Sequence, residues 1–227
     1  MKIGIIVAMD KEFVQLKTLF DQSVVECHHG KDFVVGHIGG HEVVMQQCGI
    51  GKVNSAVGAV EMILNYHPDL VISSGCAGGA DVNLNVGDVV VASACSYHDA
   101  YCGSEVAYGQ ILGMPARYEA DPALVEKALG MTCDTHVVSG LTVSGEWFVD
   151  SREKMQSILD HFPGATAVDM ESTSIAQTCF LYNVPFISFR IISDIPLKDN
   201  KASQYFDFWS RMADGSFDVT RHFLMSI

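Results

Sequence analysis

The segment Val-Pro-Phe-Ile-Ser-Phe-Arg-Ile-Ile-Ser, residues 184–193, constrains the fold most, because it is almost continuously apolar. A strand that is covered on both faces has this composition, whereas a strand with one face in water alternates apolar and polar residues. Sheets with both faces covered occur mainly in α/β proteins, where helices pack on each side. The segment therefore predicts a strand of an α/β domain, and a carboxylate, Asp194, follows it directly.

Apolar runs and helical periodicities alternate along most of the remaining chain. Residues 2–8 are rich in β-branched side chains and predict a buried first strand, after which apolar residues recur at helical spacing from Phe13 onward. Three closely spaced strands, at 23–28, 33–38 and 42–47, are separated by hairpin-type turns, which implies a mixed sheet. Further strands are predicted at 70–74, 86–92 and 136–143, and helices at 53–66, 122–129 and 151–161. No linker divides residues 1–227, so we expect a single domain.

Composition excludes several classes of function. The net charge is −13 with only 14 Lys and Arg, which argues against binding to nucleic acid phosphates. Seven cysteines are odd in number and form no Cys-x-x-Cys pair, so neither a disulfide framework nor a zinc ribbon is indicated, and we expect a reducing, cytoplasmic location. The apolar N-terminal run stops at Asp10 without a signal-peptide pattern, and no segment is long enough to span a bilayer, so we expect no membrane contact.

Two carboxylates bracket the end of another predicted strand. The run Ala167-Val168-Asp169-Met170-Glu171 passes into a helix that begins near Ser172. At such a corner one acid can turn into a cleft, and we expect Glu171 to do so; the simpler alternative is that both acids are solvated in a turn, and this stretch alone does not decide. Asp194 ends the next strand, and α/β folds bind small molecules at the carboxyl ends of their strands. The pair therefore favours acid and base chemistry at one site.

Further candidates precede this region. Glu12 lies in the first turn of the helix after the first strand, where an ordinary acid favoured by the helix dipole is the commoner explanation. Gly49 and Gly51 mark a tight turn where backbone can approach a ligand, although the spacing matches no phosphate-binding loop. The run Gly75-Cys76-Ala77-Gly78-Gly79 has little side-chain bulk and could hold a flat ligand or an anion against backbone N–H groups. Cys76 is more often a small buried thiol than a nucleophile.

Three features remain open from the residues alone. Trp147 and Phe148, near a strand end, could stack on a planar ligand or belong to the core or an interface. Residues 97–120 form a long, weakly patterned segment, which is usually functional or part of an interface. His98-Asp99 within it could suggest a metal site, but a hydrogen-bonded loop pair is favoured because no third ligand has a suitable spacing. In the helix predicted at 53–66, the expected core-facing side is the apolar set Val53, Ala56, Val57, Val60, Ile63 and Leu64.

Together, several short motifs resemble one family. They are Met9 with Glu12, Gly49-Ile50-Gly51-Lys52-Val53, Ser74 to Gly79, Val86-Gly87-Asp88, Val143-Ser144-Gly145, Val168 to Glu171, and Ile192-Ser193-Asp194. In this order they resemble the bacterial 5′-methylthioadenosine/S-adenosylhomocysteine nucleosidases of the purine nucleoside phosphorylase/uridine phosphorylase superfamily. The resemblance implies a three-layer α/β/α domain around a central mixed sheet, usually dimeric, without metal or organic cofactor.

The resemblance also implies roles for individual residues. Asp194 would be the general acid at adenine N7, Glu12 would activate the attacking water, and Glu171 would hold the ribose 2′- and 3′-hydroxyls. To act as an acid near neutral pH, Asp194 needs a raised pKa, which burial can supply. The implied substrate-binding residues are Met9 and Met170 at the sugar, Ser193, Phe148 and Val149 at adenine, Phe206 at the alkylthio end, and Ile50, Cys76, Ala77, Gly78, Val168 and Asp169. A neighbouring subunit would complete the site with its 97–120 loop, near Tyr108 and Met114-Pro115.

The implied reaction is hydrolysis of the N-glycosidic bond of 5′-methylthioadenosine and S-adenosylhomocysteine, and also of 5′-deoxyadenosine, to adenine and a 5-thioribose or ribose product. The alternatives are an aminodeoxyfutalosine hydrolase, a phosphate-dependent purine nucleoside phosphorylase, and a non-catalytic purine sensor. Phosphorolysis is disfavoured because arginines bind the phosphate dianion and the first arginine here is Arg117. Two residues depart from the family pattern: Cys76 stands where Ser is common, and Asp169 where Glu is common.

Overall fold

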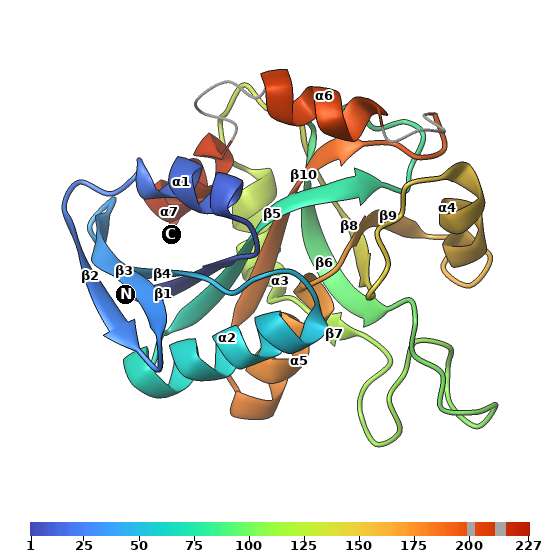
Figure 1. Cartoon of the computed structure of the whole chain (residues 1–227), viewed down its shortest axis with the longest axis horizontal. Coiled ribbons are helices and arrows are strands. Elements are labelled where there is room, and N and C mark those ends of the chain that lie inside the picture. The colour runs from blue at the N-terminus through green and yellow to red at the C-terminus, as the bar shows by residue number, and fades with distance from the viewer. Residues whose placement is uncertain (199–202, 212–216) are drawn as a thin grey trace.

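A mixed sheet lies between two layers of helices in the computed structural model, which describes residues 1–198, 203–211 and 217–227 (Figure 1). The strands are β1 (Lys2–Val7), β2 (Ser23–His28), β3 (Lys31–Ile38), β4 (His41–Gln47), β5 (Leu70–Gly79), β6 (Val89–Tyr97), β7 (Tyr118–Glu119), β8 (Val137–Ser144), β9 (Ala165–Asp169) and β10 (Phe186–Asp194). The helices are α1 (Asp10–Lys17), α2 (Lys52–Tyr66), α3 (Pro122–Leu129), α4 (Arg152–Leu159), α5 (Ser172–Tyr182), α6 (Ser203–Arg211) and α7 (Asp218–Ser226). The predicted three-layer α/β/α class with a central mixed sheet is therefore confirmed.

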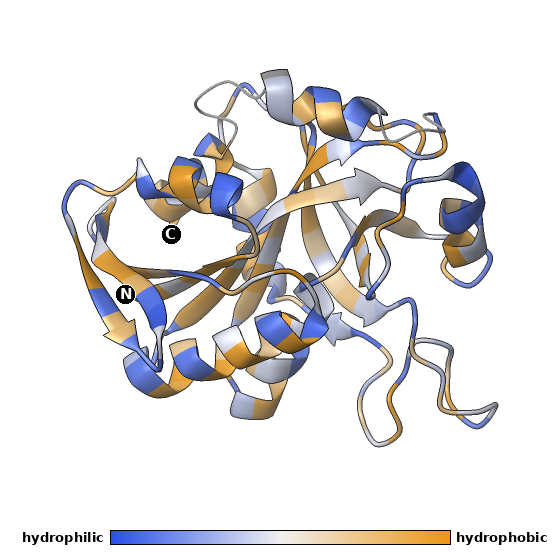
Figure 2. Ribbon diagram, viewed as in Figure 1, coloured by the Kyte–Doolittle hydropathy of each residue, from blue (hydrophilic) through white to orange (hydrophobic). Residues whose placement is uncertain are grey.

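Alternating side chains of β1 pack into two different apolar clusters. Ile3 and Ile5 of β1 pack in a cluster with residues of α1, α3, α6 and α7 on one face of the sheet. Ile6, one position further, points to the opposite face and packs in a cluster with α2 and α5. In Figure 2, apolar residues concentrate in the central strands that both layers cover. This arrangement explains why β1 and β10 lack the polar alternation of a half-exposed strand.

The sheet closes on itself at one end, which the sequence did not predict. Its strand order is β10-β6-β8-β9-β5-β1-β4-β3-β2, and β10 also pairs with β5 in parallel. Strands β5, β10, β6, β8 and β9 therefore form a closed ring, while β1, β4, β3 and β2 extend from β5 as an open sheet. The β2–β3 and β3–β4 pairs are antiparallel, as the hairpin turns predicted.

Strand β5 changes neighbours where the ring meets the open sheet. β1 pairs with β5 only as far as Ser73, and β9 pairs with the same side of β5 from Gly78. The strand continues through the glycine-rich run, which we had expected to follow a strand ending near Ser74. Between the two partners, one edge of β5 is left without a strand. The functional cleft described below opens at this gap.

Helix α2 buries a side that overlaps only partly with the predicted one. Val53, Val57 and Leu64 are exposed, Val53 to 75%, whereas the buried residues include Ser55, Gly58, Ala59 and Met62. Ile63 is buried as expected. Small side chains allow α2 to lie close to α5, so that the hydroxyls of Ser55 and Ser174 are 2.6 Å apart. Apolar residues occur along the whole of α2 (Figure 2), and hydrophobicity alone did not show which side faces the sheet.

Candidate active site

A cleft opens at the carboxyl ends of β1, β5, β9 and β10, where α/β folds bind small molecules. Among the predicted residues, it is lined by Met9, Glu12, Ile50, Cys76, Ala77, Gly78, Phe148, Val149, Val168, Asp169, Met170, Glu171, Ser193 and Asp194. Ala8, Trp147 and Tyr205 also line it. Segments far apart in the sequence are thus brought together around four carboxylates, those of Glu12, Asp169, Glu171 and Asp194.

The carboxylate of Glu12 is held by backbone groups at the gap in β5. Its Oε2 accepts hydrogen bonds from the N–H groups of Ala8 and Met9, at 3.0 and 2.9 Å, and its Oε1 accepts one from Cys76 at 3.0 Å. Cys76 lies on the part of β5 that pairs with neither β1 nor β9. Its backbone N–H therefore donates to Glu12 and not to a neighbouring strand. Burial raises the pKa of Glu12, although the backbone donors and Arg190 favour the ionised form. A raised pKa makes the ionised Glu12 carboxylate a stronger base than a free glutamate.

Gly75 provides the space that this carboxylate needs. A Cβ at residue 75 would lie 2.8 Å from Glu12 Oε1 and 3.3 Å from Arg190 Nη1. Both atoms belong to buried charged groups that other hydrogen bonds hold in place. A side chain at this position would therefore displace Glu12, which explains a glycine inside a buried strand.

Glu171 lies at the corner between β9 and α5 and turns into the cleft, as predicted. Its Oε1 accepts a hydrogen bond of 2.9 Å from the N–H of Gly51, which begins α2 with a φ of 96°. Burial and the nearby charge of Asp169 raise the pKa of Glu171 to about 7, while Arg190 opposes the shift. A carboxylate at this position can accept hydrogen bonds from two neighbouring hydroxyls.

Asp169 lies at the edge of the cleft, but its carboxylate is bound within the protein. Its Oδ2 pairs with Arg190 Nε at 2.5 Å, and its two oxygens accept hydrogen bonds from the hydroxyls of Ser144 and Ser172. The other two guanidinium nitrogens of Arg190 donate to Ser73 Oγ and to the backbone carbonyl of Phe189. Asp169 lines the cleft, but its acceptor positions serve Arg190 and two serines, and a contact between Asp169 and substrate stays a prediction.

Asp194 ends β10 beneath the opposite side of the cleft and is 4% exposed. The hydroxyl of Ser193 donates to Asp194 Oδ1 at 2.6 Å, which fixes one carboxylate oxygen. A Cβ at Gly78 would lie 3.8 Å from Oδ2, which is an ordinary van der Waals contact. Asp194 approaches the cleft from β10 and Glu12 from α1, so the two carboxylates come from separate elements.

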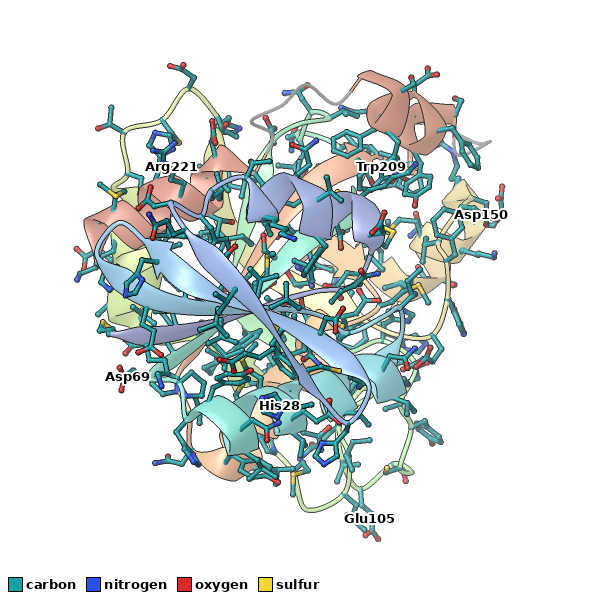
Figure 3. The ribbon with its side chains drawn as sticks, turned by 60° about the vertical axis from the view of Figure 1, so that its left-hand side comes forward. His28, Asp69, Glu105, Asp150, Trp209 and Arg221 are labelled. Atoms are coloured by element: carbon teal, nitrogen blue, oxygen red, sulfur yellow. The ribbon has the colours of Figure 1, made fainter. Side chains whose placement is uncertain are left out.

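Aromatic side chains form one wall of the cleft. The rings of Phe148 and Tyr205 meet edge to face with centroids 5.1 Å apart, and the Tyr205 hydroxyl contacts Met9 Sδ at 3.9 Å. Phe206, predicted to cover one end of a ligand, is 65% exposed and does not line the cleft. Consecutive residues of a helix point about 100° apart, so α6 directs Tyr205 inward and Phe206 outward. Trp209, labelled in Figure 3, holds α6 against α1 because the ammonium of Lys11 lies 5.0 Å from its ring.

The chemistry of Cys76 agrees with a small buried thiol. Burial and the charge of Glu12 raise the pKa of Cys76 well above its ordinary value. A thiol in this environment is neutral near pH 7 and is a poor nucleophile. Its backbone N–H, rather than its sulfur, makes the contact with Glu12.

Three lining residues were not among those predicted, and each has a local signal. Ala8 follows β1 and precedes Met9, and Tyr205 neighbours Phe206 in an aromatic cluster. For Trp147, the sequence leaves ligand stacking, the core and an interface open, and the structure places it at the cleft. No group of three His, Cys, Asp or Glu side chains in the described ranges is arranged to hold a metal ion. No described helix has the length and apolar character needed to cross a membrane.

Comparison with known proteins identifies the family. The model of the phosphorylase superfamily matches residues 2–224. A 5′-methylthioadenosine/S-adenosylhomocysteine nucleosidase of Staphylococcus aureus (strain JH9) is 40% identical over 228 residues, which cover 99% of each chain.

Solved structures agree with this similarity. The nucleosidase of the same name from S. pneumoniae, determined with the transition-state inhibitor MT-ImmA, superimposes with a TM-score of 0.93 at 33% identity over 100% of this chain and 99% of that one. The futalosine hydrolase of Helicobacter pylori strain 26695 has a TM-score of 0.91 at 27% identity over 100% and 98%. The chain therefore belongs to the phosphorylase superfamily and, within it, to the 5′-methylthioadenosine/S-adenosylhomocysteine nucleosidases.

Proposed function

We propose that this chain hydrolyses the N-glycosidic bond of 5′-methylthioadenosine and S-adenosylhomocysteine, with 5′-deoxyadenosine as a further substrate. The observation that carries the proposal is the convergence of Glu12, Glu171 and Asp194 on one largely apolar cleft. The 40% identical relative bears this activity in its name. Adenine and a 5-thioribose are the products of the two thioether substrates.

The geometry suits the charge changes of glycosidic cleavage. Breaking the bond builds positive charge on the ribose and negative charge on the departing adenine. Asp194 protonates adenine N7 in our proposal, with Ser193 fixing its carboxylate. Glu12 removes a proton from the attacking water, and Glu171 accepts hydrogen bonds from the 2′- and 3′-hydroxyls. Phe148 stacks on adenine, while Met9 and Met170 line the sugar.

The charges around the cleft favour water over phosphate as the nucleophile. In the described part of the chain, no Lys or Arg side chain lines the cleft. Arg190 lies beneath it, and its guanidinium is occupied by Asp169 and Ser73. Binding of a phosphate dianion normally requires arginine side chains that are available to the ligand. We therefore infer hydrolysis rather than phosphorolysis.

A substrate panel tests the proposal against its rivals. Purified protein is incubated separately with 5′-methylthioadenosine, S-adenosylhomocysteine and 6-amino-6-deoxyfutalosine, and adenine release is followed. We expect kcat/KM to be highest for the first two. A preference for the futalosine would instead support the activity named for the Helicobacter pylori structure. Absence of turnover with saturable adenine binding would support a purine sensor.

Affinity for the nucleoside will depend on pH through Glu171. Ribose hydroxyls donate to the ionised carboxylate, so binding favours the deprotonated form, and the pKa of Glu171 is about 7. Affinity for a non-hydrolysable, carbon-linked analogue will therefore fall as pH decreases, by up to about tenfold per pH unit below the pKa. Calorimetric titrations across this range measure the effect. In Glu171→Gln, this pH dependence will be absent; its persistence would assign the titration to another group.

We also propose that the protein acts as a homodimer in which the 97–120 segment completes the neighbouring site. This segment projects from the body of the molecule (Figure 1). Tyr101 and Leu112 within it are exposed, as are Val53 and Val57 of α2 and Phe180 at the end of α5. Exposed apolar side chains gathered on neighbouring elements support burial against another chain.

A cytoplasmic location is also part of the proposal, and the seven free cysteines support it.

Replacing Val57 with Glu will dissociate the proposed dimer, because it places a charge in an apolar contact. Sedimentation will give the wild type twice the 24.7 kDa of one chain and the variant the mass of one chain. Adenine release will fall by at least about tenfold because the neighbouring segment is lost. Val24→Glu, at an exposed position on β2, serves as the control. A wild-type protein with the mass of one chain would contradict the proposal.

A further inference from the structure

Three residues behind the cleft form a closed set of hydrogen bonds, which we call the clamp: Lys52, Asp99 and Glu146. The ammonium of Lys52 donates to both oxygens of Asp99, at 2.9 and 2.8 Å. The backbone N–H of Glu146 donates to Asp99 Oδ2 at 2.9 Å. The Glu146 carboxylate in turn accepts the backbone N–H of Lys52 at 2.7 Å. Each member therefore contacts both of the others, and three separate segments are joined.

The clamp adjoins two parts of the site. Lys52 follows Gly51, whose N–H donates to Glu171, so the clamp holds the donor that orients this carboxylate. Glu146 immediately precedes Trp147 and Phe148, which line the cleft. The Glu146 side chain also fills the space beside Gly51, where a Cβ would lie 2.7 Å from Glu146 Oε2.

Within the clamp, the Lys52–Asp99 ion pair is partly buried, whereas Glu146 is exposed. The side chains of Lys52 and Asp99 are 28% and 10% exposed, so water screens their attraction less than at an open surface. The Lys52 ammonium also lies 5.3 Å from the centroid of the Tyr97 ring. On the other side of the loop, His98 meets Trp147 edge to face with ring centroids 5.3 Å apart. The loop from Gly145 is thus held from two sides.

We propose that Lys52, Asp99 and Glu146 are positioning residues that set the spacing between the adenine-stacking loop and the ribose-binding Glu171. This inference rests on the proposed function, because it assigns a further part of the same site. None of the three lines the cleft as described. Glu12 and Asp194 are anchored by other contacts, so loss of the clamp affects substrate binding more than the chemical step.

Substitution of Lys52 separates positioning from stability. Lys52→Met keeps most of the side-chain length but removes the ammonium, whereas Lys52→Arg keeps a cation that can bind both oxygens of Asp99. We expect Lys52→Met to raise KM for 5′-methylthioadenosine and Kd for adenine by about tenfold, with kcat changed by less than about threefold. Lys52→Arg will restore most of the affinity. Lys17→Met, at an exposed position of α1, is the matched control.

The outcomes distinguish the clamp from the function on which it rests. KM and adenine Kd unchanged in a folded Lys52→Met variant would overturn the inference, as would a lowered Tm with no change in either constant. A wild-type protein that binds adenine without hydrolysing the nucleoside would overturn the proposed function, while the adenine Kd of the variants would still test the clamp. A wild-type protein that neither hydrolyses the nucleoside nor binds adenine would overturn both the proposed function and the role of the clamp.

Discussion

Replacing Glu12 with Gln will lower kcat for adenine release from 5′-methylthioadenosine by a factor of about 10³, the range of a lost general base. Gln has nearly the same size but cannot take a proton from water. KM will change little, because Glu171 and the aromatic wall remain. Steady-state kinetics in phosphate-free buffer measure both constants.

The environment of Glu12 also predicts a stability effect. All three contacts of the carboxylate are with backbone N–H donors. The amide group of Gln places its own N–H groups against at least one of these donors, at a cost of about 1–3 kcal/mol for an unsatisfied buried group. Asp10→Asn, which removes an exposed carboxylate in the same helical turn, is the control. Full turnover by a folded Glu12→Gln variant would refute the assignment of Glu12 as the base.

Replacing Asp194 with Asn will lower kcat by a factor of about 10²–10⁴, because the amide can donate a hydrogen bond to adenine N7 but cannot transfer a proton. The Asn carbonyl can keep the hydrogen bond from Ser193, so the local structure will be preserved. Ser193→Ala will have a smaller effect, since it removes only the group that orients the acid.

An activated substrate tests the assignment of Asp194 chemically. A 4-nitrophenyl glycoside of the same 5-thioribose has a leaving group that departs without protonation. We expect Asp194→Asn to cleave it at nearly the wild-type rate, while Glu12→Gln remains impaired. Equal losses on both substrates in the Asp194 variant would indicate that this residue acts on the sugar or on the fold instead of the leaving group.

Local patterns predicted the elements well because they depend on neighbouring residues. The bounds predicted for β2 and α3 match the structure, and the acids at the ends of β9 and β10 meet as expected. The family resemblance, and not a local pattern, predicted that Glu12 lies at the same site as Glu171 and Asp194. The residues alone favoured an ordinary acid at position 12. Glu12 accepts a hydrogen bond from the N–H of Cys76, which lies far along the chain, so no local pattern shows this contact.

The features that escaped prediction depend on partners distant in sequence. The sequence does not show that Arg190, on β10, pairs with the carboxylate of Asp169. Periodicity could not show that small residues of α2 face the protein while Val53 and Val57 are exposed. Closure of the ring likewise requires the pairing of β5 with β10, which no local signal encodes.

The proposal that water is the nucleophile is tested most directly by measuring the products from 5′-methylthioadenosine with and without phosphate. We expect adenine and free methylthioribose under both conditions, at the same rate, because no Lys or Arg of the described residues lines the cleft to bind phosphate. Turnover that occurs only with phosphate and yields a sugar 1-phosphate would contradict hydrolysis.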